Sequence, residues 1–309
     1  MTDRFQRFVH RIIDAAGVPI HVWIGGQGEP LLLLHGYPET HMMWHRVVHR
    51  LAEHFTVVCP DLRGYGDSGR PEAGADHAGY SKRAMGADQF EVMTQLGFDR
   101  FLVMAHDRGA RVCHQMLLDH PERIRRAILL DIMPTLDMYE NLSMELATAY
   151  YHWFFLIQPY DIPERMIEAD PGLIVNSFIS RMSADEEAFP EDVVAHYIEK
   201  FSDPAVIHAT CEDYRAAATI DLEHQREARL QPKFTVPTLV IWGTQSLRKY
   251  DMLGIWREKG AHVTGLLAEH CGHYIPEEDP ALTLRAAEVF FGSENDVLTE
   301  EECDRILAG

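Results

Sequence analysis

The fold of this chain is decided by the stretch Phe101-Leu102-Val103-Met104-Ala105-His106-Asp107-Arg108-Gly109-Ala110-Arg111. An apolar run of strand length enters a tight turn, and a helical pattern follows it. The small residues Ala105 and Gly109 tolerate a strained turn that exposes the side chain between them, which is the pattern of a nucleophile elbow. The exposed residue is Asp107, whose carboxylate can displace a leaving group from an sp³ carbon and form an alkyl ester. The alternative is that Asp107 is simply the N-cap of the helix.

Short apolar runs alternate with longer helical patterns on both sides of this elbow. We expect strands at 8–13, 21–24, 30–34, 56–59, 101–105, 126–130 and 238–242, and helices at 42–52, 81–96 and 108–120. From residue 30 onward the strand runs are apolar throughout, as in parallel strands that are covered on both faces. The pattern predicts an α/β fold built on a mostly parallel, doubly wound sheet.

The region 136–229 breaks this alternation. It is rich in Met, Tyr, Phe and acidic residues and contains no apolar strand run. We interpret it as a helical cap inserted over the sheet. The core then consists of residues 1–135 and 230–309, with the sheet resuming near Pro232.

Composition excludes several classes of protein. Among the 309 residues, 46% are hydrophobic and 25% are charged, which are the proportions of a globular chain and not of a disordered one. The 28 basic and 48 acidic residues give a net charge of −20, which argues against nucleic-acid or anionic membrane partners. Five widely spaced cysteines without a CxxC pair, no signal-like start and no run long enough to span a bilayer predict a soluble cytoplasmic protein.

Two further turns supply candidate catalytic groups. His35-Gly36-Tyr37-Pro38 follows a buried strand, and we expect the backbone amides of Tyr37 and Arg108 to form an oxyanion hole. His273 follows the last strand near the C-terminus, where a general base is expected in a chain of this order. The cluster His270, Cys271 and His273 does not have the spacing of a structural zinc site, so we expect no metal.

The acid that would orient His273 has two candidates. Asp131 stands at the tip of the strand that ends at Leu130, and its side chain is expected to enter the same crevice as Asp107. The later strand ending at Gly243 is followed by no carboxylate before Asp251. We therefore choose Asp131 and keep Asp251 as the alternative.

Four segments together give the sequence a family resemblance: 35–38, 105–111, 130–135 and 272–278. Over nearly the whole chain, as far as Pro280, it resembles fluoroacetate dehalogenases and other haloacetate dehalogenases of the α/β-hydrolase superfamily. The resemblance implies hydrolysis of haloacetates or other 2-haloacids to halide and a 2-hydroxy acid through an ester on Asp107. It also implies a homodimer that needs no metal or organic cofactor and that acts on a small-molecule haloacid.

The resemblance further implies how a haloacid is bound. Arg108 and Arg111 match two arginines that hold the substrate carboxylate, and their planar guanidinium groups suit that task. His152, Trp153 and Tyr214 match the donors that bind the departing halide. The structural alternatives are that the arginines lie on the helix surface and pair with acids, and that the aromatic side chains belong to the core. The chain departs from its relatives at Tyr37, where they usually have Phe, which makes the pocket wall more polar.

Two other functions are compatible with the sequence. An epoxide hydrolase would use the same Asp107, Asp131 and His273 with two tyrosines from Tyr150, Tyr151 and Tyr214 as acids. The pair of arginines speaks against this function, because a neutral epoxide needs no carboxylate clamp. A non-catalytic binding protein of this fold would usually have lost a member of the catalytic set, and here all members are present.

Overall fold

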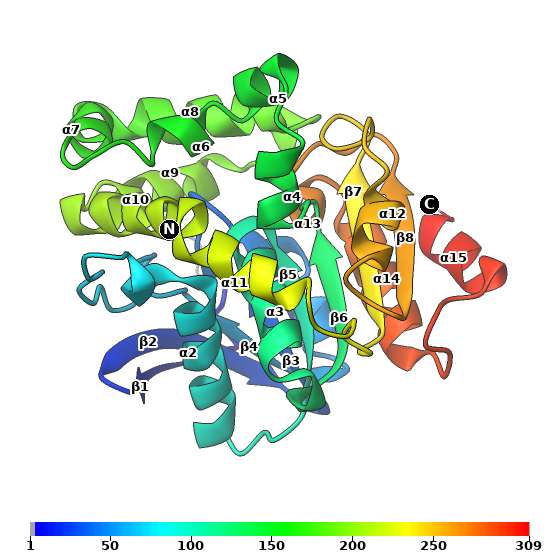
Figure 1. Cartoon of the computed structure of the whole chain (residues 1–309). Helices are drawn as coiled ribbons and strands as arrows, with labels where there is room; N and C mark the ends of the chain where they lie inside the picture. Colours follow the sequence, from blue (N-terminus) through cyan, green and yellow to red (C-terminus); the bar gives the residue numbers. More distant parts are fainter. Residues whose placement is uncertain (1–3, 309) are drawn as a thin grey trace.

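An eight-stranded sheet forms the centre of the molecule, as described by a computed structural model of residues 4–308. The strand order is β1-β2-β4-β3-β5-β6-β7-β8; β2 is antiparallel to both β1 and β4, and all other pairs are parallel (Figure 1). The strands are β1 (Val9–Ala15), β2 (Val18–Gly26), β3 (Glu29–Leu34), β4 (Phe55–Pro60), β5 (Phe101–His106), β6 (Ile124–Leu130), β7 (Thr238–Gly243) and β8 (Val263–Ala268).

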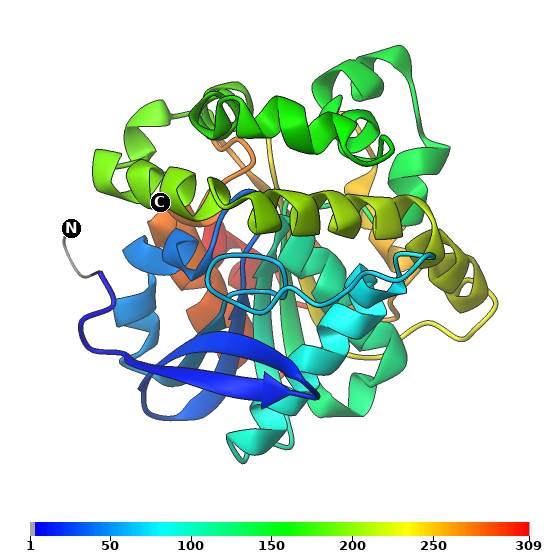
Figure 2. The same cartoon turned by 90° about the vertical axis from the view of Figure 1, so that its left-hand side faces the viewer.

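Helices cover both faces of this sheet, which is why its central strands are apolar throughout. Every residue of β5 is buried, as are the four leucines that end β3. Figure 2 shows α2 and α3 against one face, and α1 and α14 against the other. The bounds of the core helices are α1 (Val48–Leu51), α2 (Lys82–Gln95), α3 (Asp107–Asp119), α12 (Met252–Arg257), α13 (Ile275–Glu278), α14 (Pro280–Gly292) and α15 (Glu300–Leu307).

Eight helices, α4–α11, lie between β6 and β7 in the chain, and we call them the inserted helices. Both cartoon views show α5–α10 across the end of the sheet at which the parallel strands finish (Figures 1 and 2). Their bounds are α4 (Thr135–Glu140), α5 (Met144–Ala149), α6 (His152–Phe155), α7 (Ile162–Glu168), α8 (Pro171–Met182), α9 (Glu191–Phe201), α10 (Pro204–Ala218) and α11 (Ile220–Ala228).

The expected α/β architecture is confirmed, with two local differences. Each of the seven expected strands is present, but β8 was not expected, because Thr264 and Gly265 interrupt its apolar run. The helix expected at 42–52 is divided into a 3₁₀ helix, His41–Arg46, and the short α1. The division falls at Val47 and Val48, two successive β-branched residues that fit poorly into a continuous helix.

Two glycines allow α3 to begin tightly against the end of β3. Asp107 has a positive φ of 41°, which is a strained backbone conformation for a residue with a side chain. A Cβ atom on Gly36 would stand 2.7 Å from the Asp107 Cβ atom, and one on Gly109 would stand 2.5 Å from the His35 carbonyl oxygen. Neither position can hold a larger residue without displacing the elbow.

We predict that Gly109→Ala lowers the free energy of unfolding by about 1–3 kcal/mol, because the new methyl group meets backbone and a buried leucine. Gly292→Ala is the matched control, since nothing lies within 4 Å of its Cβ position. That control should be neutral or slightly stabilising. Urea unfolding followed by circular dichroism measures both, and equal midpoints for the two variants would contradict the close approach at the elbow.

Candidate active site

Asp107, His273 and Asp131 meet at the ends of the parallel strands. Asp107 follows β5, Asp131 follows β6, and His273 lies in the turn after β8. His273 Nε2 is 3.8 Å from the Asp107 Oδ2 atom, and His273 Nδ1 is 2.5 Å from the Asp131 Oδ2 atom. The three side chains are buried, so a histidine connects two carboxylates in an interior with little access to water.

Two further groups hold Asp131 in this position. The backbone amide of Gly243 donates to Oδ1 at 2.9 Å, and the Ser246 hydroxyl donates to Oδ2 at 2.5 Å. The alternative acid, Asp251, instead accepts a hydrogen bond from the Gly254 amide and caps α12 at the surface. The residues after Gly243 therefore supply a hydroxyl that supports the acid, a role that the sequence alone did not indicate.

The carboxylate of Asp107 is ionised although it is buried. Burial raises the pKa of this group, but the nearby charges of His273 and Arg111 outweigh burial and lower the pKa to about 2. The Tyr37 backbone amide donates to Oδ1 at 3.0 Å. The N-cap of α3 is His106 and not Asp107, so the interpretation of Asp107 as a simple helix cap was wrong.

His273 has a pKa above its usual value. Burial by itself lowers the pKa of the imidazole, but the hydrogen bond and the negative charge of Asp131 raise it by more. The Asp107 carboxylate adds to this effect. The imidazole therefore binds a proton more tightly than an exposed histidine does, and it can accept one from a group placed between it and Asp107.

Arg108 is engaged by a buried acid that sequence reasoning missed. Its Nε and Nη2 atoms each donate to Asp213 at 2.8 Å, and its Nη1 atom is buried without a hydrogen-bond acceptor in the described residues. Asp213 also accepts from Tyr65 and from the ammonium group of Lys82. Lys82 lies 3.8 Å from the Asp221 carboxylate, so the charges of this group balance.

Arg111 differs from Arg108, because no carboxylate is hydrogen-bonded to it. Its Nη1 atom donates to the Met133 carbonyl at 2.7 Å and to the Thr135 hydroxyl at 3.2 Å. Its Nε atom is buried and lacks an acceptor within residues 4–308. Burial lowers the pKa of the guanidinium to about 10, so it remains charged at neutral pH. The positive charge of Arg111 is thus the less compensated of the two.

Three aromatic donors lie beside these arginines. His152 and Trp153 are on α6 and Tyr214 is on α10, and all three are buried. The Arg108 guanidinium stands 4.0 Å from the Tyr214 ring centre, and that of Arg111 stands 4.5 Å from the Trp153 ring. In the described part of the chain, none of these aromatic side chains makes a hydrogen bond.

The other two tyrosines that the sequence offers as acids, Tyr150 and Tyr151, lie farther from this group. The Tyr150 hydroxyl is 3.4 Å from Ser246 Oγ, on the side of the site where Asp131 lies. Tyr151 is more than one-third exposed, and its ring lies beside Arg181. The inserted helices therefore contribute His152, Trp153 and Tyr214 to the group around the two arginines.

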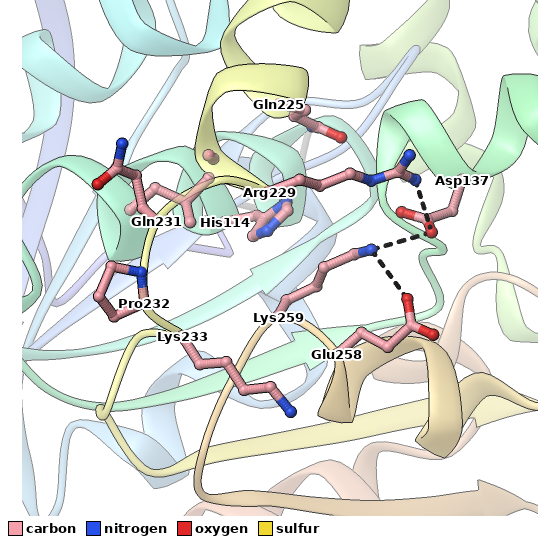
Figure 3. A pocket seen from close by; sticks show the side chains of 11 residues that line it. His114, Asp137, Gln225, Arg229, Gln231, Pro232, Lys233, Glu258 and Lys259 are labelled. Atoms are coloured by element: carbon pink, nitrogen blue, oxygen red, sulfur yellow. Dashed lines mark hydrogen bonds and ion pairs between the residues drawn. The ribbon is translucent and has the colours of Figure 1, made fainter.

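A separate cavity of about 260 Å³ lies farther along α3 (Figure 3). Figure 3 shows Arg229 and Lys259 reaching Asp137 across it. Its lining includes no residue of the site described above, and His114 is its only contribution from α3 besides Leu118. The residues of the candidate active site and the residues that line this charged cavity thus form two separate groups.

Residues 4–308 contain neither a metal-binding cluster nor a membrane-spanning helix. The described residues contain no group of three or more His, Cys, Asp or Glu side chains arranged to hold a metal ion. They also contain no helix that is both long and apolar enough to cross a membrane.

Known proteins resemble this chain over most of its length. The profile of the α/β-hydrolase fold family matches residues 29–280. A fluoroacetate dehalogenase from Burkholderia sp. is 40% identical over 93% of this chain and 94% of its own length. A soluble epoxide hydrolase from Corynebacterium sp. is 33% identical over 89% of this chain and 94% of its own length. The crystal structure of an α/β hydrolase from Nostoc sp. PCC 7120 is 51% identical, with a TM-score of 0.91 over 93% and 99% of the two chains.

We predict that Asp213→Asn destabilises the fold by about 3–5 kcal/mol, because it leaves the charges of Arg108 and Lys82 buried with only Asp221 near them. Glu53→Gln is the control, since it removes an exposed ion pair with Arg50. The control should change stability little. Chemical unfolding at neutral pH compares the two, and a small effect at Asp213 would show that Arg108 does not depend on its buried partner.

Proposed function

Because the chain belongs to the α/β-hydrolase superfamily, we propose that it is a hydrolytic dehalogenase of haloacetates and other short 2-haloacids. The products are halide and a 2-hydroxy acid. The similarity to a fluoroacetate dehalogenase supports this proposal, and the similarity to an epoxide hydrolase makes it necessary to say what favours the haloacid.

One observation carries the choice of substrate: a buried arginine without a bonded carboxylate lies next to an ionised buried nucleophile. Arg111 has a buried N–H group that needs an acceptor, and so does Arg108. A substrate carboxylate can satisfy both N–H groups and compensate the charge of Arg111. A neutral epoxide would not compensate the charge of Arg111. It would also leave the buried N–H groups of Arg108 and Arg111 without an acceptor, which is energetically unfavourable.

In the first step, Arg108 and Arg111 hold the substrate carboxylate so that the halogen-bearing carbon faces Asp107. The carboxylate oxygen forms a bond to that carbon, and the electron pair of the carbon–halogen bond leaves with the halide. His152, Trp153 and Tyr214 offer one N–H or O–H donor each to the departing anion. Burial lowers the pKa of His152 to about 3, so the imidazole is neutral and acts as a single donor.

In the second step, His273 accepts a proton from water, and the resulting hydroxide attacks the ester carbonyl of Asp107. Asp131 holds the imidazole and stabilises its protonated form. The backbone amides of Tyr37 and Arg108 are proposed to bind the negative oxygen of the intermediate, each contributing roughly 3 kcal/mol. The bond between the Asp107 carbonyl carbon and the ester oxygen then breaks. That oxygen leaves with the substrate carbon and takes the proton from His273, which releases the hydroxy acid and restores the Asp107 carboxylate.

The inserted helices are proposed to act as a cap in this reaction. They supply the three halide donors, whereas the two core segments, 1–135 and 230–309, supply the nucleophile, acid and base. The proposed unit is a homodimer that needs no metal or organic cofactor, as the resemblance to haloacetate dehalogenases implies. The second candidate is an epoxide hydrolase that uses Asp107, with the buried Tyr214 and the half-buried Tyr150 as its acids.

We predict that the protein releases halide from fluoroacetate or chloroacetate and forms no diol from styrene oxide. Halide is measured by ion chromatography and diol by liquid chromatography. Asp107→Asn should abolish formation of the enzyme ester in a single turnover, which mass spectrometry detects. Diol without halide would instead identify an epoxide hydrolase, and halide release by Asp107→Asn would exclude Asp107 as the nucleophile.

We predict that turnover falls as the pH decreases through the pKa of His273, which lies above the ordinary value of 6.5, because the imidazole must be neutral to accept a proton. Asp131→Asn removes the charge that raises this pKa. Its acidic limb should shift to lower pH, with a plateau reduced by about 10³–10⁴-fold. Asp251→Asn should leave both the limb and the plateau unchanged. An unshifted limb in Asp131→Asn would contradict the assigned pair.

A further inference from the structure

A second buried group of acids and a histidine lies directly behind His273 and has no part in the proposed mechanism. It consists of Glu39, His106 and Glu277, each at most 2% exposed. Glu39 precedes the 3₁₀ helix that begins at His41, His106 ends β5, and Glu277 is on α13. Three separate elements therefore bring ionisable side chains together next to the proposed catalytic base.

His106 connects this group to the loop of His273. Its Nε2 atom is 2.9 Å from the His273 carbonyl oxygen, and its Nδ1 atom is 3.2 Å from Glu39 Oε2. The two imidazole rings also lie in contact, with centroids 4.5 Å apart. A displacement of the His106 ring would therefore move both the backbone and the side chain of His273.

The carboxyl groups of Glu39 and Glu277 lie close enough for each to shift the pKa of the other. Glu39 Oε1 and Glu277 Oε2 are fully buried, and neither has a hydrogen-bond partner among the described residues. Two ionised carboxylates cannot hydrogen-bond to each other, because each is only an acceptor. A proton between them satisfies both oxygens at once.

The hydrogen atoms of the group can be counted from its contacts. A carbonyl oxygen only accepts, so His106 Nε2 must carry a hydrogen to bond His273. The contact between His106 Nδ1 and Glu39 needs a second hydrogen, and the contact between Glu39 and Glu277 needs a third. With three hydrogens on one imidazole and two carboxylates, the group has no net charge, as its complete burial requires.

Among the described residues, no cation is bonded to the Glu277 carboxylate and removes the need for this proton. The Tyr197 hydroxyl on α9 donates to Glu277 Oε1 at 2.9 Å as a neutral group. His45 Nδ1 stands 3.8 Å from the same oxygen, and burial lowers the pKa of His45 to about 4, so it is uncharged at neutral pH. The Arg46 guanidinium donates to the Glu277 backbone oxygen and not to the carboxylate.

Tyr274, Glu278 and His273 itself also face the pair. The Glu278 charge favours protonation of Glu277, whereas a protonated His273 lowers the pKa of Glu39. Burial first and Glu39 second hold the pKa of Glu277 well above its usual range. Burial also raises the pKa of Glu39, but the hydrogen bond and charge of His106, together with smaller effects of Glu277 and His273, outweigh burial, so the pKa of Glu39 is lowered.

We propose that Glu39, His106 and Glu277 are positioning residues that share protons as a neutral unit and hold the His273 loop for the ester-hydrolysis step. This inference rests on the proposed function, since it assigns the unit to the step in which His273 acts as the base. In the described residues no side chain of the unit is hydrogen-bonded to Asp107, although the charge of His106 is one of those that lower the pKa of Asp107. Glu277, the residue changed in the test, is not among those charges. Its loss should therefore slow the second step and leave halide release in the first turnover intact.

The test compares Glu277→Ala with Glu277→Gln, using fluoroacetate and chloroacetate. The alanine variant leaves the Glu39 oxygen unpaired and should lower kcat on the order of tenfold to a hundredfold, with KM unchanged or lower. It should release one halide per enzyme in a fast burst and accumulate the Asp107 ester, detectable by mass spectrometry. The glutamine variant keeps the shape and supplies an N–H where the proton stood, so its kcat should stay within about threefold of the unmodified protein.

A stability measurement keeps the inference testable if the alanine variant does not fold. Because the pKa of Glu277 is raised in the folded state, its contribution to stability is complete below the ordinary carboxyl pKa and decreases as the pH rises towards the folded value. Glu277→Gln removes this titration and should flatten the decline in melting temperature between pH 5 and the alkaline range. Glu288→Gln, an exposed change on α14, should retain the decline.

Three results would overturn the inference: unchanged kcat without a burst in Glu277→Ala, a glutamine variant as slow as the alanine variant, or identical pH–stability curves for Glu277→Gln and the unmodified protein. Failure of the proposed function has a different signature. In that case the unmodified protein releases no halide from either haloacid, while the comparison of pH–stability curves still tests the shared proton.

Discussion

Charge that is removed from water must be balanced nearby, and the interior of this protein is organised around that requirement. Arg108 lies against Asp213, His273 lies between two acids, and the carboxyl pair behind it is proposed to share a proton. Each balance joins elements that are far apart in the chain. The ends of the parallel strands are therefore held in place by ionic and hydrogen-bonding partners as well as by apolar packing.

Within this arrangement the two arginines of α3 have different tasks. Asp213 compensates the charge of Arg108 and fixes the orientation of its guanidinium, which leaves one N–H donor without an acceptor in the described residues. Arg111 is held only by neutral oxygens and keeps most of its attraction for an anion. The proposed binding of a small anion by a chain with a net charge of −20 would depend on this division. At cellular salt the field of the surface reaches only about 8 Å, whereas a buried guanidinium acts at contact distance.

Sequence patterns predicted the sheet and the elbow because both depend on local rules. Apolar runs of strand length and small residues around Asp107 are visible without knowledge of the rest of the fold. Strand β8 was not predicted because a glycine and a threonine interrupt its apolar run. The ion pair of Asp213 was not predicted because its partner, Arg108, is 105 residues away in the chain. Such pairs exist only after the inserted helices dock on the core. Asp131 could be chosen over Asp251 because a strand tip has a predictable direction, but Ser246, which supports it, had no comparable signal.

The position of Asp213 on α10 also restricts how the interior can be reached. Arg108 and Lys82 belong to the core, and both donate to this one carboxylate. Movement of α10 away from the core would therefore separate buried charges from their partners, which is energetically unfavourable. Helix α10 is thus fixed to α2 and α3 by charge as well as by packing. Substitutions that reshape the interior from α10 must therefore keep this carboxylate or replace the charge balance that it provides.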